Sequence, residues 1–158
     1  MDTAFSATDI LQPDAINLNL VGKNATDAIK ELHAEFRQNV AISDGALFLR
    51  ELLARQALGS NCLDQEVALP HVRTLAVKRI VLAVGRSGSG VVFDETHPSI
   101  RLIFLVGVPT AAASEYLRCV ALLARMLHNP ALRKTFFDAT TPNEFRSTWA
   151  SSMERARR

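Results

Sequence analysis

Alternating and continuous apolar segments along the chain predict the strands of a sheet. Residues 16–20 alternate between apolar side chains and asparagines, which is typical of a half-buried strand. The apolar runs at residues 80–84 and 102–106 have the length of strands that are covered on both faces. A further short strand is predicted at residues 67–69, because Pro70 pushes the residue before it into an extended conformation.

Five segments show the spacing of apolar residues that predicts amphipathic helices. They are residues 24–36, a segment from near Ser43 to Gly59, residues 114–128, a short segment after Asn129-Pro130 and a segment that starts at Thr141. The first has an asparagine as its N-cap. The last begins with a threonine cap, a proline in the first turn and a glutamate three residues after the cap. The expected apolar side of residues 114–128 consists of Leu117, Val120, Ala121, Ala124 and Leu127.

The order of these elements predicts a single α/β domain with a central mixed β-sheet and helices packed on both faces. We expect its core to span residues 10–150, followed by a basic tail at residues 151–158. The glycine-rich residues 85–90 are expected to form a turn between two strands. A phosphate-binding loop is the alternative, but this segment lacks the Gly-Lys-Ser/Thr ending and the following helix of such loops.

Composition and charge argue against several classes of protein. The 158 residues are 48% hydrophobic and 22% charged, which is typical of a globular domain. The net charge of +2 equals the excess of Arg155, Arg157 and Arg158 over Glu154, so the rest of the chain is balanced and we expect no nucleic-acid partner. No apolar run could span a bilayer, the first residues do not resemble a signal peptide, and the two cysteines lack a Cys-x-x-Cys spacing. We therefore expect a cytoplasmic protein that is not embedded in a membrane.

The candidate site is centred on His71, which follows Pro70 at the end of the predicted short strand. Proline restricts the backbone on both sides, so the imidazole is expected to be held by a rigid element. With an ordinary pKa of about 6.5, a histidine is partly neutral in the cell, and its neutral ring nitrogen is a nucleophile. For the Pro-His pair alone, the alternative is a structural histidine that is hydrogen-bonded to the backbone.

Three motifs around this histidine occur in a fixed order. They are Arg55-Gln56 at the end of a predicted helix, Ser60-Asn61-Cys62 in the following loop, and Val-Ala-Leu-Pro-His-Val-Arg at residues 67–73. With these motifs, and with sixteen residues from the arginine to the histidine, residues 10–149 resemble a known family. It is the enzyme IIA domain of the bacterial phosphoenolpyruvate-dependent phosphotransferase system, in its fructose/mannitol and nitrogen-regulatory class.

This resemblance implies a phosphoryl carrier. His71 would accept the phosphoryl group from a phosphohistidine carrier protein of the HPr or NPr type, and Arg55 would pair with the phosphoryl oxygens. The alternative for Arg55 is a solvated arginine at the end of its helix, whose charge complements the helix dipole. Ser60 could donate a hydroxyl hydrogen bond to the phosphoryl group. Arg73 shares the face of the histidine if the strand continues, and the alternative for it is a surface ion pair. Transfer between histidines in this family needs no metal and no cofactor.

The resemblance also bears on partners. The sequence contains no attached sugar-specific IIB segment and no membrane-embedded IIC segment. We therefore expect a regulatory role of the nitrogen-related type rather than direct sugar transport. By resemblance to the family, a sensor kinase or a transporter is the candidate for the regulated target.

Two departures from the family pattern favour an alternative, a non-catalytic binding module that keeps the fold. Tyr116 stands where the family has a second active-site histidine. Its hydroxyl could donate to a phosphoryl oxygen but cannot supply a titratable positive charge. The simpler interpretation is that Tyr116 covers the apolar side of its helix. Asp64 and Glu66 lie in the loop where the family has glycines, and their charges would repel an incoming phosphoryl group unless they point away.

The other residues with reactive or metal-binding side chains do not predict a further site. Asp94, Glu95 and His97 match no spacing of metal ligands, so no metal site is expected. His33 and His128 are expected on the surfaces of their helices.

Overall fold

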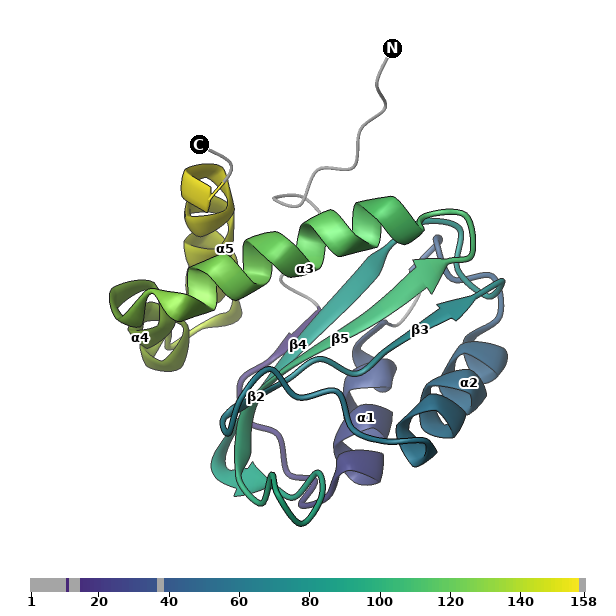
Figure 1. Ribbon diagram of the computed structural model, residues 1–158, viewed down its shortest axis with the longest axis horizontal. Coiled ribbons are helices and arrows are strands. Elements are labelled where there is room, and N and C mark those ends of the chain that lie inside the picture. Colours follow the sequence, from purple (N-terminus) through teal and green to yellow (C-terminus); the bar gives the residue numbers. More distant parts are fainter. Residues whose placement is uncertain (1–10, 12–14, 37–38, 157–158) are drawn as a thin grey trace.

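The computed structural model describes residues 11, 15–36 and 39–156, which form one α/β domain (Figure 1). The strands are β1 (Ile16–Asn17), β2 (Val67–Ala68), β3 (His71–Thr74), β4 (Val81–Val91) and β5 (Ile100–Pro109). The helices are α1 (Ala25–His33), the 3₁₀ helix η2 (Ala34–Phe36), α2 (Gly45–Ala57), α3 (Ala113–His128), α4 (Pro130–Asp138) and α5 (Pro142–Ala156). None of these helices combines the length and the apolar character that crossing a membrane requires.

The five strands form one mixed sheet, as the order of elements predicts. The strand order is β1-β4-β5-β2, and β3 also pairs with β5, further along that strand than β2. β4 and β5 run antiparallel, whereas β1 is parallel to β4, and β2 and β3 are parallel to β5. The first residue of β3, His71, lies opposite Val106 of β5. The candidate histidine is therefore attached to the central part of the sheet.

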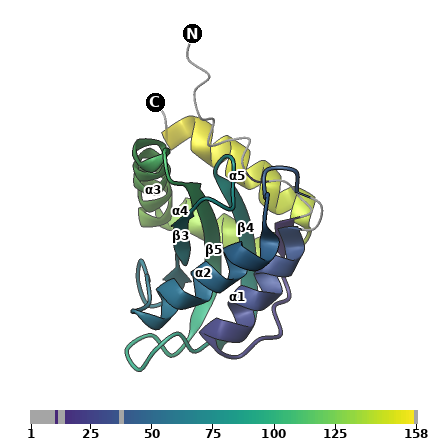
Figure 2. The ribbon, with the colours of Figure 1, turned by 90° about the vertical axis from the view of Figure 1, so that its right-hand side faces the viewer.

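Helices cover both faces of this sheet (Figure 2). α1 and α2 lie against one face, and the layer of α3, α4 and α5 lies against the other. Alternate side chains of β5 face the two layers. Phe104 packs with Trp149 of α5, their ring centroids 6.0 Å apart, whereas Ile103 belongs to the same core cluster as Phe48 of α2. Burial on both faces explains why residues 102–106 are continuously apolar.

Helix starts largely follow the predicted capping residues. The side chain of Asn24 accepts a backbone hydrogen bond at the start of α1, and Thr141 does the same at the start of α5. α2 begins after Asp44, in agreement with the predicted start near Ser43. The hydroxyl of Ser43 donates to the carbonyl of Ala76, which leaves the neighbouring aspartate to cap the helix.

The glycine-rich segment does not form the predicted turn, because β4 continues through it. A Cβ on Gly85 would lie 2.6 Å from a methyl carbon of Leu20, so glycine here lets that side chain approach the strand closely. The register with β5 shifts in the second half of β4, where the hydroxyl of Ser87 accepts a hydrogen bond from the backbone nitrogen of Gly90 (3.0 Å). The glycines therefore serve packing and a strand irregularity rather than a connection.

Strand β1 and the apolar side of α3 also differ from the prediction. β1 has two residues rather than five, and the side chain of Asn17 accepts a hydrogen bond from the backbone nitrogen of Asn19 (2.9 Å), which turns the chain. On α3, Leu117 is 65% exposed and Ala121 is exposed, whereas Leu123 is buried. The buried stripe of α3 is thus rotated relative to the predicted one.

The C-terminal helix continues past the predicted end of the core. α5 extends to Ala156, and Ser152 and Met153 are buried although the sequence predicts a tail from residue 151. Arg157 and Arg158, and the predicted start of the core at residue 10, lie outside the described residues.

Candidate functional site

His71 is fixed by backbone pairing on both sides of the Leu69–Pro70 step. β2 ends at Ala68 and β3 begins at the histidine itself, and both strands pair with β5. The carbonyl of Pro70 accepts a hydrogen bond from the backbone nitrogen of Val106 (2.9 Å). The predicted strand before the histidine is present, but the chain does not turn at this residue, because a second strand starts there. The rigid placement expected from the proline is nevertheless observed.

The imidazole is oriented by the backbone carbonyl of Leu69, two residues before it. Nδ1 of His71 lies 2.9 Å from the carbonyl oxygen of Leu69. A carbonyl can only accept, so Nδ1 carries the hydrogen and donates it, and Nε2 of the neutral ring is left with its lone pair. The side-chain nitrogen of Asn61 is 3.5 Å from the same Nδ1. Because a protonated Nδ1 cannot accept a hydrogen bond, this amide is a close neighbour of the ring and not its second partner.

Tyr116, in the first turn of α3, stacks on the imidazole. The two ring centroids are 4.9 Å apart and the ring planes meet at 29°. Burial raises the pKa of the phenol far above its ordinary value of 10, and the nearby Arg55 only partly offsets this rise. The hydroxyl is therefore neutral and remains a hydrogen-bond donor. The residue that the resemblance places at the position of a second histidine thus stacks directly on His71.

Arg55 brings a positive charge to both rings from the last turn of α2. Its Nη1 donates to the carbonyl of Gly59 (3.0 Å), whose φ of 139° suits the glycine that was predicted to end this helix. Burial lowers the pKa of His71, the hydrogen bond to the backbone of Leu69 opposes this, and the charge of Arg55 lowers the pKa further. The histidine is therefore biased toward its neutral form beside a fixed cation.

Ser60 is hydrogen-bonded to groups other than the imidazole, and Arg73 follows His71 along β3. The hydroxyl of Ser60 accepts from the side chain of Gln56 (2.8 Å) and donates to the carbonyl of Phe93 (3.3 Å). Arg73 is exposed two residues after His71 on β3, on the same face of the strand. Roles for these two side chains in phosphate binding stay predictions.

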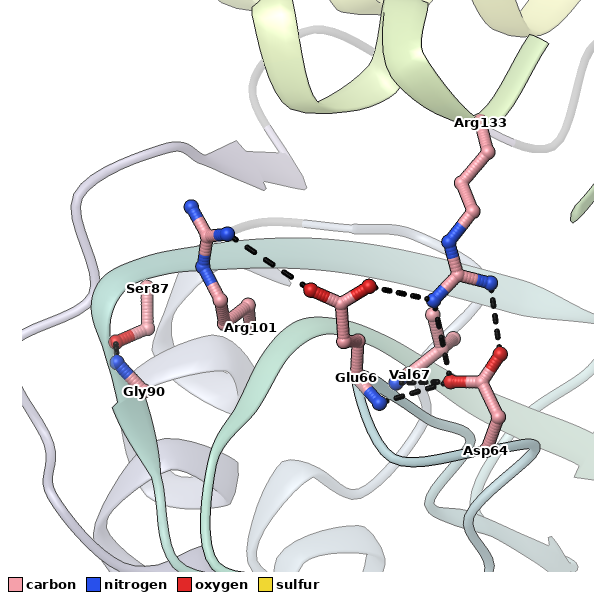
Figure 3. A network of polar contacts seen from close by, with 7 residues as sticks. All are labelled: Asp64, Glu66, Val67, Ser87, Gly90, Arg101 and Arg133. Carbon is pink, nitrogen blue, oxygen red and sulfur yellow. Dashed lines mark hydrogen bonds and ion pairs between the residues drawn. The ribbon is translucent and has the colours of Figure 1, made fainter. Parts of the chain in front are cut away.

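The acidic loop residues are paired with arginines (Figure 3). Nη1 of Arg133, on α4, lies 2.7 Å from Oδ2 of Asp64, and its Nη2 lies 3.0 Å from Oε1 of Glu66. Arg101 of β5 approaches the other oxygen of Glu66 at 3.8 Å. The repulsion expected from these carboxylates is therefore offset within the fold. Sequence reasoning missed Arg133, because 67 residues separate it from Glu66.

Two further histidines have structural contacts. Nδ1 of His97 lies 2.8 Å from Oδ1 of Asp94, and this contact is the main cause that lowers the pKa of the aspartate to about 2. No group of three potential metal-ligating side chains occurs in the described part of the chain. His33 is not the ordinary surface residue that was expected. Its ring meets Phe48 edge-on at 5.5 Å, and its Nε2 lies 2.9 Å from the carbonyl of Gly45.

The two partly buried histidines predict a pH-dependent stability. Burial lowers the pKa of His33 and His71 below the ordinary value of 6.5. Below that value the unfolded chain binds protons that the folded chain does not, so the free energy of unfolding should be highest above pH 6.5 and fall as the pH decreases toward the folded-state pKa values. NMR titration of the imidazole resonances and urea unfolding at several pH values would check this. A His71 midpoint above 6.5 would contradict it.

The mixed sheet with helices on both faces is the fold of solved enzyme IIA proteins. The chain belongs to the family of the phosphoenolpyruvate-dependent sugar phosphotransferase system, EIIA 2, whose model matches residues 9–151. The resemblance inferred from the motifs is thereby confirmed.

Individual relatives agree with this assignment. The chain is 26% identical over 144 residues to the PTS system fructose-specific EIIA component of Haloferax volcanii, which covers 87% of this chain and 93% of that protein. It is 25% identical over 134 residues to the PTS system fructose-specific EIIABC component of Bacillus subtilis, with 84% of this chain but only 21% of the relative covered. The crystal structure of nitrogen regulatory protein IIA-Ntr from Neisseria meningitidis superimposes with a TM-score of 0.80 at 26% identity, covering 90% of this chain and 97% of that one.

Proposed function

We propose that this protein is a phosphohistidine carrier of the phosphotransferase system and that Nε2 of His71 is the phosphoryl acceptor. The observation that carries the proposal is the contact between Nδ1 and the carbonyl of Leu69, which leaves Nε2 as the free nucleophile. The nearby charge of Arg55, which acts on the pKa of the same ring, supports it. A neutral nitrogen next to a guanidinium is suited to receive an anionic phosphoryl group.

In the proposed step, the lone pair of Nε2 attacks the phosphorus of a phosphohistidine on an HPr- or NPr-type donor. The new N–P bond forms as the N–P bond of the donor breaks, and the donor imidazole keeps the electron pair. The positive charge that develops on the ring of His71 is stabilised by the hydrogen bond from Nδ1 to Leu69. Arg55 is assigned to the phosphoryl oxygens, with Tyr116, Ser60 and Arg73 as further donors. No metal ion takes part in this step.

A regulatory role is the second part of the proposal. The solved relative from Neisseria meningitidis is a nitrogen regulatory protein, and two curated relatives, from Bradyrhizobium diazoefficiens and Pseudomonas aeruginosa, have the same name. We assign this chain to the same role: the phosphorylation state of His71 in the cytoplasm would be communicated to a target, with a sensor kinase or a transporter as the candidate.

The test is incubation with phosphoenolpyruvate, Enzyme I and an HPr-type protein, followed by intact-mass measurement. We expect one added phosphoryl group that is lost in mild acid and kept in alkali, which distinguishes an N–P bond from a serine or tyrosine phosphate. A known enzyme IIA protein in a parallel reaction shows that the donor is competent. No adduct on this protein under those conditions would contradict the proposal.

That negative result would instead support a binding module without phosphoryl transfer. The observation that favours this second candidate is Tyr116, a neutral phenol at the position of the family's second histidine. The other argument for a binding module is the negative charge of the acidic loop. It is weakened by the pairing of Asp64 and Glu66 with Arg133.

A further inference from the structure

Arg133 holds the loop that precedes the candidate histidine from the opposite layer of the fold. It lies in the first turn of α4, where the helix dipole disfavours a positive charge, so the helix itself gains nothing from an arginine there. Its side chain is only 20% exposed and makes three hydrogen bonds, two to Asp64 and one to Glu66 (Figure 3). The carboxylates of Asp64 and Glu66 are 42% and 44% exposed, so the specificity of this contact comes from its geometry: one guanidinium fork bridges two carboxylates.

The carboxylate of Asp64 connects Arg133 to the backbone of the loop. Its Oδ1 accepts hydrogen bonds from the backbone nitrogens of Glu66 (2.8 Å) and Val67 (3.0 Å), the second of which is the first residue of β2. Partial burial raises the pKa of Asp64, but the hydrogen bonds from Arg133 and from this backbone outweigh it and keep the pKa below its ordinary range. Asp64 is therefore an ionised link between α4 and the start of the strand.

The same loop contains the groups that orient the imidazole. The backbone nitrogen of Leu69 donates to the carbonyl of Asn61 (2.7 Å), and Cys62 forms an isolated bridge with Ala68. The loop therefore folds back along residues 67–69, and Leu69 in turn supplies the carbonyl that fixes Nδ1 of His71. A continuous set of contacts thus leads from Arg133 through Asp64 and the backbone to the ring.

We propose that Arg133 is a positioning residue for His71, acting through Asp64 and Glu66. It does so in two ways: it anchors the backbone that carries the ring's hydrogen-bond acceptor, and it neutralises two carboxylates in the loop beside the site. Its role in transfer rests on the proposed function. Its role in orienting the ring does not.

The first measurement is the rate of phosphoryl transfer for Arg133→Gln, which keeps a polar side chain but removes the charge and the fork. We expect the rate to fall by about ten- to a hundredfold, as displacements of a reacting group typically cause. Lys134→Gln is the matched control, because it removes one charge from the next residue of the same helix, where the partner is Asp138. A rate for Arg133→Gln equal to that of the control would overturn the proposal.

The second measurement tests the route. In the Asp64→Asn/Glu66→Gln background, the new amide at position 64 keeps an oxygen that can accept from the backbone, but no carboxylate remains to be neutralised. We expect Arg133→Gln to change the transfer rate by less than about twofold there, because the effects of residues in one network are not additive. An unchanged ten- to hundredfold loss in that background would show that Arg133 does not act through these carboxylates.

The third measurement needs no donor protein. ¹⁵N NMR of the imidazole should show the Nδ1–H tautomer of His71 in the wild type and a mixture of tautomers in Arg133→Gln, under conditions where both remain folded. If Arg133→Gln does not fold, Arg133→Lys, which keeps the charge but not the fork, should give the same shift in a weaker form. An identical tautomer in wild type and variant would overturn the positioning role. Absence of transfer in the wild type would refute only the proposed function.

Discussion

Replacing His71 by glutamine should abolish the phosphoryl adduct completely. Glutamine has a similar size and can still hydrogen-bond to the backbone of Leu69, but its amide nitrogen is not a nucleophile. Two neighbouring groups cannot substitute: Arg55 carries a cationic guanidinium, and burial keeps the Tyr116 phenol neutral and weakly nucleophilic. The loss should therefore be all or none when intact mass is measured after incubation with a competent phosphohistidine donor.

The matched control for this prediction is His128→Gln, at the exposed end of α3. It removes an imidazole without touching the site and should take up the phosphoryl group as the wild type does. An adduct that survives in His71→Gln would show that the acceptor is another residue. Because the chain has four histidines, peptide mapping of that adduct would then identify it.

Truncating Trp149 to alanine should lower the free energy of unfolding by about 3–5 kcal/mol. The indole is completely buried in the layer between the sheet and α5, where it packs against Phe104. The cavity that remains would lie in the core cluster that includes Phe104 of β5, Leu123 of α3 and Phe136 of α4, and closely packed side chains of this kind cannot fill it without rearrangement. Since small domains have only about 5–15 kcal/mol of stability, this single change removes a large share of it.

Urea unfolding followed by far-UV circular dichroism would measure this effect. Fluorescence is unsuitable, because Trp149 is the single tryptophan of the chain. Ser151→Ala, an exposed position on the same helix, is the control and should change stability by less than about 0.5 kcal/mol. A loss of under about 1 kcal/mol for Trp149→Ala would mean that α5 does not pack on the sheet in this way.

Much of the fold could be predicted where one local signal dominates. The two apolar runs became β4 and β5, and the capping residues Asn24 and Thr141 mark helix starts. The turn predicted at the glycine-rich segment was wrong because its cause is not local: Gly85 is required by the approach of Leu20, which is distant in sequence. Similarly, the exposure of Leu117 depends on how α3 docks, and helical periodicity alone does not define it to within one residue.

The features of the candidate site likewise fall into two groups, those that a local sequence signal predicts and those that depend on tertiary contacts. The proline before His71 and the spacing to Arg55 are visible in the sequence. In the structure, the charge of Arg55 lies near enough to the ring of His71 to lower its pKa. The stacking of Tyr116 and the neutralisation of Asp64 by Arg133 are tertiary contacts between distant segments. No sequence spacing encodes them, so the effect of the acidic loop could not be judged before the fold was known.

The strand pairing also has a consequence for the order in which the protein can be completed during synthesis. β2 and β3 pair with β5, which is made about thirty residues later, whereas β4 and β5 are joined by the short connection at residues 92–99. A short connection loses little chain entropy on closing, so the β4–β5 hairpin can form as soon as it leaves the ribosome. The segment around residue 71 emerges earlier, but its pairing partner β5 is part of this hairpin. The histidine can therefore acquire its fixed orientation only after the chain has been translated past Pro109.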